Sequence, residues 1–138
     1  MATAVMALGI STSIIAMQRG FKQLDVARGT TLSSQILQSE IERVRMMSWA
    51  AVSDSSTMMG TRTVNLSTMF SSDPVLAAKF TLTRTITADA TRPTDAVNIV
   101  LSVTWKTYDG RAQSRKFHTK YIKNGLYDYY YTLANPAP

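Results

Sequence analysis

Hydrophobic and polar residues follow two different periods along this chain, and the change between them divides it into a helix and a sheet. Residues 1–17 contain no charged side chain, and no proline interrupts the sequence from there to Trp49. After residue 17 the apolar positions recur every three to four residues, as in an amphipathic helix. The pattern therefore predicts one long N-terminal helix, apolar in its first third and two-faced afterwards.

The two-faced part of this helix, residues 25–50, has one side that is suited to cover a sheet. At about 100° per residue, that side collects aliphatic residues, while the opposite side mixes apolar and polar ones. We expect the first side to pack on the rest of the chain through Val26, Leu37, Ile41 and Val44, with Ile36 and Met47 beside them. The opposite side, followed back to residue 21, carries Phe21, Leu24, Leu32 and Met46, which are either scattered surface residues or a second contact face for other helices.

Glycine and hydroxyl residues weaken one stretch of the predicted helix. Gly9 and Gly20 bracket Ser11 and its neighbours Thr12 and Ser13. A glycine inside a helix costs about 1 kcal/mol relative to alanine, and serine or threonine hydroxyls compete for backbone hydrogen bonds. We therefore expect a kink or partial unwinding between Gly9 and Gly20 in any assembled state.

The second period, of two residues, begins near residue 79 and predicts strands. Three segments alternate apolar and polar side chains. Residues 89–95, with Pro93, are expected to connect the first two strands, and Asp109-Gly110 to form a tight hairpin. The apolar face is predicted to consist of Phe80, Leu82, Ile86, Val97, Ile99, Leu101, Val103, Trp105, Phe117, Thr119 and Tyr121. The result is a three-stranded antiparallel meander over residues 79–123.

The remaining segments complete an α+β fold. Residues 51–78 are rich in Ser, Thr, Met and Gly and are expected to be a loop, with at most a helical turn or an extended piece near residues 63–66. Residues 124–138 form a tyrosine-rich tail that we expect to pack over the sheet edge, because tyrosine buries its ring and keeps its hydroxyl wet. The chain thus divides into an apolar helix, residues 1–24, and a globular head, residues 25–138.

Composition excludes some chemistry and leaves the partners open. The 138 residues include no cysteine, which removes zinc–cysteine sites and thiol catalysis, and the formal net charge is +6. Such a charge is typical of a solvated basic surface, or it attracts DNA or lipid headgroups. Because the sequence has no long run of consecutive basic residues, the charge alone does not decide between a solvated surface and a surface that binds DNA or lipid.

The sequence offers no arrangement of side chains for catalysis. His118 is the one histidine, so a metal site or a His-based triad lacks partners. Glu40 and Glu42 point in nearly opposite directions on a helix and cannot act as an acid/base pair. Their i,i+3 partners Arg43 and Arg45 are expected only to solvate the flank of the helix. We predict a protein that is not an enzyme and holds no cofactor or metal.

Residues 1–17 have three possible environments. A bilayer-spanning helix needs roughly 20 apolar residues, and this run falls slightly short. A signal peptide would have a basic start and a small-residue cleavage site, which are missing here. A buried core helix would need a larger domain around it. A membrane anchor whose first turns precede Met1 fits best, although Arg19 and Lys22 directly after the run favour a cytoplasmic location for that end unless a basic leader also precedes it.

Together these features resemble the type IV pilins and the type II secretion pseudopilins. The resemblance rests on the apolar residues 5–17, their continuation over residues 18–40, the arginine-flanked end before Trp49, and the strand pair with its Asn-Gly end over residues 97–121 and 124–128. It covers nearly the whole chain and is specific in architecture, whereas the individual motifs are weak. The family's basic leader, its glycine cleavage site and the following phenylalanine and glutamate do not occur within residues 1–17, so we expect them to precede Met1.

The resemblance implies a structural subunit that waits in the inner membrane and is assembled with copies of itself into an extracellular helical filament by a pilus assembly machinery. The helices would bundle in the filament core. The residues expected to make these contacts are Val5, Leu8, Ile10, Ile14, Ile15, Phe21, Leu24 and Leu32. Two alternatives stay open: a low-copy pseudopilin of a type II secretion or DNA-uptake machine, and a membrane-tethered basic module that binds DNA or a surface.

Overall fold

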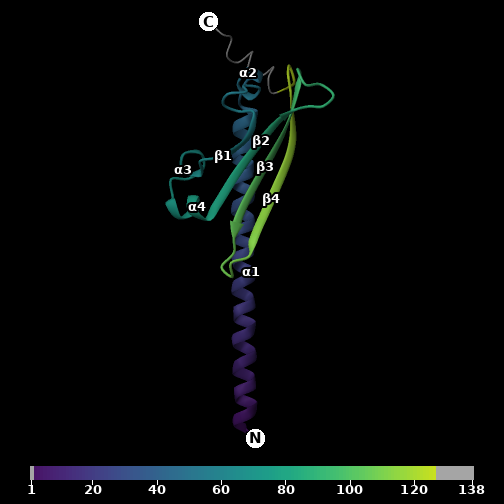
Figure 1. Ribbon diagram of the computed structural model, residues 1–138. Helices are drawn as coiled ribbons and strands as arrows, with labels where there is room; N and C mark the ends of the chain where they lie inside the picture. The colour runs from purple at the N-terminus through teal and green to yellow at the C-terminus, as the bar shows by residue number, and fades with distance from the viewer. Residues whose placement is uncertain (1, 127–138) are drawn as a thin grey trace.

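The fold combines one long helix with one antiparallel sheet. The computed structural model describes the backbone of residues 2–126 and the side chains from residue 6 onwards. Helix α1, Ala2–Arg45, is 44 residues long, and its first half extends alone beyond the rest of the molecule (Figure 1). Its second half lies behind the sheet. The predicted α+β architecture, a long helix packed by its second half on an antiparallel meander, is confirmed.

Helix α1 is unbroken across the stretch that was predicted to be weak. The hydroxyl of Ser11 donates to the carbonyl of Ala7 at 2.8 Å, and the hydroxyl of Ser13 donates to that of Gly9 at 2.9 Å. These side chains thus bond back to the helix that carries them. The kink between Gly9 and Gly20 was predicted for an assembled state, and it stays a prediction.

The helix ends earlier than predicted, at Arg45 instead of residue 50. A new short helix, α2, Trp49–Val52, follows it, and the hydroxyl of Ser48 accepts a hydrogen bond from the backbone N–H of Ala51 at 3.4 Å. Serine in this position satisfies a backbone donor that a helix start leaves open. Ser48 is therefore the N-cap of a separate helix, at a place where the sequence pattern predicted that the long helix continues.

The sheet has four strands, one more than predicted. Strands β1, Gly60–Val64, β2, Phe80–Ala88, β3, Ala96–Lys106, and β4, Ala112–Ile122, pair in the order β1-β2-β3-β4, and all pairs are antiparallel. The three predicted strands and both predicted connections are confirmed, with Gly110 at φ 78° in the hairpin. The sequence indicated only a possible extended piece near residues 63–66 here, because four of the five residues of β1 are exposed and show no alternation.

The segment predicted as a loop, residues 51–78, is therefore largely structured. Besides α2 and β1 it contains α3, Leu66–Met69, and α4, Pro74–Lys79. The side-chain oxygens of Asn65 and Asp73 accept hydrogen bonds from the N–H groups of Ser67 and Val75, at 3.0 and 2.9 Å. These caps support helices too short to show a hydrophobic period. Of the predicted tail, residues 127–138 lie outside the described part of the chain.

Helix and sheet approach closely where the helix carries small residues. Gly29 and Ser33 are buried against the sheet, and a Cβ placed on Gly29 would overlap the indole Nε1 of Trp105. The indole ring in turn contacts Phe80, with ring centroids 5.8 Å apart. The predicted core residues Leu37, Ile41, Val44 and Ile36 are buried. Thus the predicted packing side is confirmed for its C-terminal part.

Two apolar residues of the helix lie elsewhere than predicted. Val26 is 40% exposed, because it precedes Gly29, where close packing on the sheet begins. Leu32, which was assigned to the opposite side, is half-buried and packs against the core of its own head. The covered side of the helix is therefore broader and begins later than the sequence pattern suggested.

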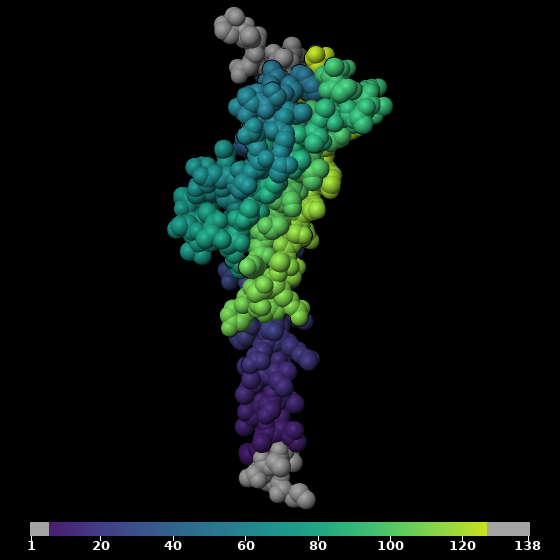
Figure 2. All heavy atoms as spheres, viewed as in Figure 1, coloured from purple at the N-terminus to yellow at the C-terminus, as the bar shows by residue number. Residues whose placement is uncertain are grey.

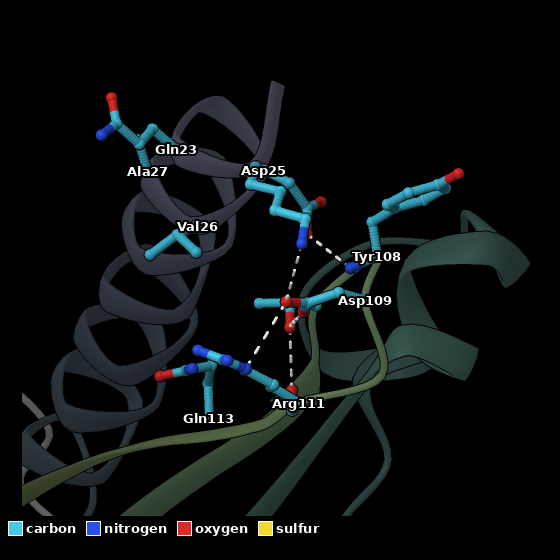
Figure 3. Close-up of a pocket in the computed structure, with 10 residues that line it drawn as sticks. Gln23, Asp25, Val26, Ala27, Tyr108, Asp109, Arg111 and Gln113 are labelled. Carbon is cyan, nitrogen blue, oxygen red and sulfur yellow. Dashed lines mark hydrogen bonds and ion pairs between the residues drawn. The ribbon is translucent and has the colours of Figure 1, made fainter. Parts of the chain in front are cut away.

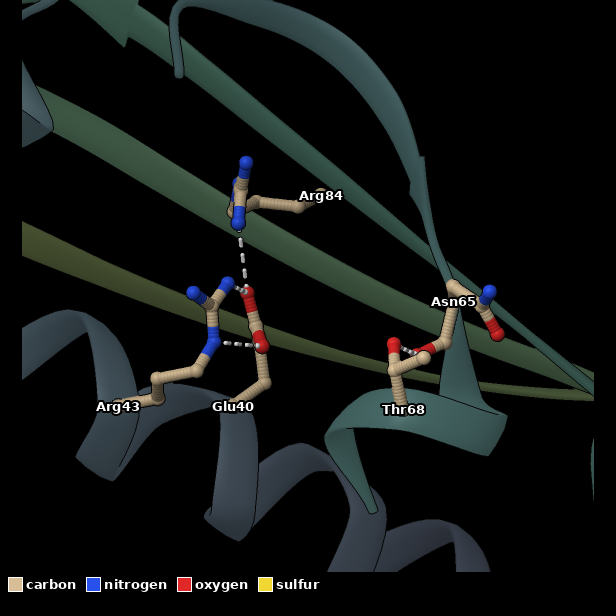
Figure 4. Close-up of polar contacts among 5 residues, drawn as sticks. All are labelled: Glu40, Arg43, Asn65, Thr68 and Arg84. Carbon is tan, nitrogen blue, oxygen red and sulfur yellow. Dashed lines mark hydrogen bonds and ion pairs between the residues drawn. The ribbon is translucent and has the colours of Figure 1, made fainter. Parts of the chain in front are cut away.

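A buried ion network joins the C-terminal end of helix α1 to the sheet (Figure 4). The Glu40 carboxylate accepts hydrogen bonds from Arg84 Nη1 at 2.8 Å and from Arg43 at 2.7 and 2.9 Å. The side chains of Glu40 and Arg84 are 2% and 6% exposed. The expectation that Glu40 and Arg43 only solvate the flank of the helix is wrong, because Arg84 points inward from β2 between Leu82 and Ile86 and requires an anion there.

Candidate functional site

The part of α1 that leaves the head is an exposed apolar rod, which we call the stalk, residues 6–24 (Figure 2). Its large apolar side chains are mostly exposed to solvent. Phe21 is 70% exposed and Leu24 60%, and Leu8, Ile10, Ile14 and Ile15 are at least half exposed. Monomeric proteins rarely expose a contiguous apolar surface of this kind, and where they do it is typical of an interaction site.

Most of these side chains share one line along the stalk, which we call the seam. Its residues alternate in steps of three and four, the spacing that keeps one apolar row in register along a helix. The seam consists of six exposed residues: Ala7, Ile10, Ile14, Met17, Phe21 and Leu24. This spacing is the one with which helices pack against one another as knobs into holes, so the seam is built to meet another helix.

The seam changes character where the head begins. The same seven-residue repeat continues along α1 with Arg28, Thr31, Gln35, Gln38 and Glu42, and these residues are all polar and exposed. The backbone thus offers the same row in both halves, but the row is apolar in the stalk and polar beside the head. The apolar contact surface stops at Leu24, within a single helix.

The other predicted contact residues are divided between the stalk and the head. Leu8 and Ile15 lie on a second, shorter line of the stalk and are exposed. Leu32, as described above, packs on its own head. The side chain of Val5 lies outside the described part of the structure. The stalk therefore brings together Leu8, Ile10, Ile14, Ile15, Phe21 and Leu24, and leaves Leu32 apart.

A polar clasp holds the head to the helix at the point where the seam changes (Figure 3). The Asp25 carboxylate accepts hydrogen bonds from the backbone N–H of Tyr108, at 2.7 Å, and from Lys79 Nζ, at 3.1 Å. Tyr108 lies in the β3–β4 hairpin and Lys79 at the end of α4. One carboxylate on the helix thus fixes two segments far apart in sequence.

A second carboxylate supports the same hairpin. Asp109 accepts a hydrogen bond from the hydroxyl of Thr107 at 2.5 Å and forms ion pairs with Arg111, at 3.6 Å, and with Lys22 of the helix, at 3.9 Å. The hydrogen bond from Thr107 is the main cause that lowers the pKa of Asp109. The N–H of Tyr108, followed by Lys79, lowers the pKa of Asp25. Both groups are therefore anionic over the neutral pH range.

The clasp surrounds an open cleft between the helix and the hairpin, but the cleft does not collect reactive groups. Its wall includes Val26 and Gln113 besides the clasp, and its carboxylates are occupied by hydrogen bonds. Within residues 2–126, no cluster of three or more His, Cys, Asp or Glu side chains is placed to hold a metal ion. His118 is exposed on β4. The absence of catalysis stays a prediction.

Sequence reasoning found the stalk but missed the clasp. Asp25, Lys79 and Tyr108 carry no local pattern, since their partnership depends on how the hairpin returns to the helix. The seven-residue repeat was a signal that could have been used, because its change from apolar to polar marks the boundary at Leu24. The domain boundary predicted between residues 24 and 25 stays a prediction.

Among the helices of the described chain, none is both long enough and apolar enough to cross a membrane. Comparison of the chain with protein-family models, curated proteins and solved structures found no match.

Proposed function

We propose that this protein is a structural subunit of an extracellular helical filament of the type IV pilus kind, assembled through its N-terminal helices. The observation that carries the proposal is the exposed apolar seam of the stalk. Burial of such a surface away from water is favourable, by roughly 25 cal/mol per Å² of apolar area. A second copy presents the same seam, so copies of this chain are the partner that the surface fits.

The shape of the molecule supports an open polymer. The stalk leaves the head at one end, and the head packs on one side of the helix only (Figure 1). Contacts between different surfaces of successive copies generate open helical filaments where the rotation between copies does not close a ring. In such a filament the stalks form the core and the heads the outer layer. Before assembly, the subunit is held in the inner membrane and delivered by the assembly machinery.

The residues in the core are the exposed ones of the stalk, and the polar half of the seam sets where the core ends. Arg28 and Gln35 are solvated beside the head, so burial of that half between helices would cost the desolvation of their polar groups. Contact between subunits should therefore be tight along residues 6–24 and looser above them.

Removal of detergent from the purified full chain tests the proposal. We expect filaments that negative-stain electron microscopy resolves and that sediment at low speed. A full-length chain that stays monomeric in plain buffer would contradict it. A chain that forms no filament alone, but joins filaments of another subunit, would instead be a low-copy pseudopilin. Mass spectrometry of the native N-terminus is the companion measurement, because pilin processing leaves a cleaved and methylated start.

A further inference from the structure

The head exposes large apolar side chains at two places that lie at opposite edges of the sheet. At one edge, α3 and α4 contact each other and β2, and we call this part of the chain, residues 66–79, the lobe. At the other edge β4 borders α1, so the lobe and β4 lie on opposite sides of the head in Figure 1. Val75 of the lobe is 72% exposed and Met69 47%, while Phe117 of β4 is 38% exposed.

A groove opens between α1 and β4 at the second edge. It has a volume of about 360 Å³, and its apolar lining includes Leu37, Ile41 and Phe117. Arg115 of β4 reaches across to α1, where its Nη1 donates a hydrogen bond to the hydroxyl of Ser34 at 3.0 Å. The groove is therefore a preformed apolar site, large enough for side chains of the size of valine or methionine.

The rim of the groove is mainly basic. Arg45, Arg115 and Lys116 line it together with a single carboxylate, that of Glu42. Among the described residues, no ion pair is found for Arg115 or Lys116. The Glu42 carboxylate accepts a hydrogen bond from Gln38 at 3.0 Å, within the same helix. The groove thus favours an apolar partner that also carries an anion.

The lobe of this chain carries that combination of groups. Asp73 is exposed, and its carboxylate accepts a hydrogen bond from the backbone N–H of Val75 at 2.9 Å, which keeps the anion beside the exposed valine. The other charged residue within residues 66–79 is Lys79, and its ammonium group bonds to Asp25. The remaining charge of the lobe is therefore negative, opposite to that of the groove rim.

We propose that the lobe of one copy docks in the groove of the next copy of this chain, so that neighbouring heads meet through two different surfaces. The exposed side chains of Val75 and Met69 enter the apolar groove, and the carboxylate of Asp73 approaches the basic rim. Charges at such a rim fix the orientation of the partners more than they add affinity. A second copy is the fitting partner because one chain presents both complementary surfaces.

This contact rests on the proposed function and adds a second point of attachment to it. Because the lobe and the groove lie at opposite edges, a head that donates its lobe keeps its groove free for a further copy. Such contacts continue as an open series where the rotation between copies does not close a ring. The subunits are then joined twice, by the stalk seam in the filament core and by the lobe and groove in the outer layer.

Cross-linking of assembled chains tests the contact, because the sequence has no cysteine that would interfere. The V75C/F117C variant carries one thiol on each surface. It is assembled with an equal amount of wild type, whose intact surfaces support the filament, and treated with a short bis-maleimide. We expect covalent dimers and longer multimers from the filaments and single chains from protein dispersed in nonionic detergent. The matched control is V75C/H118C, in which the second thiol moves by one residue to the opposite face of β4, and it should give no multimers.

Each other outcome would contradict the contact. Filaments that contain V75C/F117C but yield no multimers would overturn it and leave the proposed filament intact. Equal amounts of multimers from V75C/H118C, or covalent dimers from F117C alone, would show that the thiols meet without a lobe in the groove. If a bulky maleimide cannot reach F117C in dispersed chains, the chain's own residues 127–138 cover the groove, and the contact is overturned. A wild type that forms no filament would contradict the proposed function and the contact with it.

Discussion

The two halves of helix α1 share a backbone and a seven-residue repeat, but they differ in what covers them. In the upper half, the side that faces the sheet is filled by Ile36, Leu37 and Val44, and the opposite row is polar. In the stalk the row is apolar and exposed, although the β3–β4 hairpin reaches Lys22 near the end that joins the head. The head half buries most of its large apolar side chains within the chain. The stalk leaves its large apolar side chains exposed.

This difference teaches where self-association is encoded. A helix is stabilised in water mainly by the packing of an apolar face, and the stalk has that face without a partner in its own chain. The polar half shows that the same helix can be built to stay solvated. The apolar seam is therefore a local property of residues 6–24 and does not follow from the fold of the head.

The largest expected effect comes from making the apolar seam of the stalk polar. In the I14N/F21N variant, two seam positions become polar, and each loses the roughly 1.5–3 kcal/mol that full burial of one large apolar side chain supplies. We expect filament formation to be abolished, while the head unfolds at an unchanged temperature. Sedimentation after detergent removal and circular dichroism measure the two properties.

The head half supplies the matched control for the seam variant. R28N/Q35N changes the same heptad positions two repeats further along, where the residues are already polar and exposed. This variant should assemble like the wild type. Equal assembly of I14N/F21N and wild type would show that the seam does not hold the subunits together.

The next largest effect concerns the attachment of the head half to the sheet. In E40L the guanidinium of Arg84 remains buried without its anion, which typically costs about 3–5 kcal/mol. In E40L/R84M both charges are gone and apolar side chains take their places, so we expect most of that loss to be recovered. Urea unfolding of the full chain in nonionic detergent measures both. A double variant as unstable as E40L would show that packing, and not the buried charge, is responsible.

Much of this fold could be predicted from the sequence, because its main elements are marked by periodicity. Strands β2 and β3 alternate buried and more exposed residues along most of their length, β4 shows a weaker alternation, and Gly110 supplies the positive φ of the hairpin. β1 could not be found in this way, since it is an edge strand whose side chains are mostly exposed. Its place depends on pairing with β2, as in the contact of the Thr61 and Thr85 hydroxyls at 3.0 Å.

The errors on the helix have a common cause. Periodicity assigns a side to each residue but does not say how near the sheet comes. Gly29 lets Trp105 approach the backbone, and this draws Leu32 toward the core and leaves Val26 outside it. Glu40 was misjudged because its partner Arg84 lies 44 residues away in the sequence. Contacts of this kind belong to the tertiary structure and leave no local pattern.

The smallest expected effect is at the clasp, the boundary between the two halves. Asp25 has a lowered pKa, so its hydrogen bonds to Tyr108 and Lys79 stabilise the folded chain above the ordinary aspartate pKa of 3.8. As the pH falls through the lowered pKa, that contribution is lost. The free energy of unfolding of D25N should therefore be lower than that of the wild type at neutral pH, by about 1 kcal/mol or less. At acid pH the two free energies should converge, and thermal unfolding at several pH values measures both.

D95N, at an exposed site outside the clasp, controls for the loss of one charge. A difference between D25N and wild type that persists unchanged at acid pH would mean that the carboxylate does not hold the hairpin through its charge, and the boundary between stalk and head would then rest on packing alone.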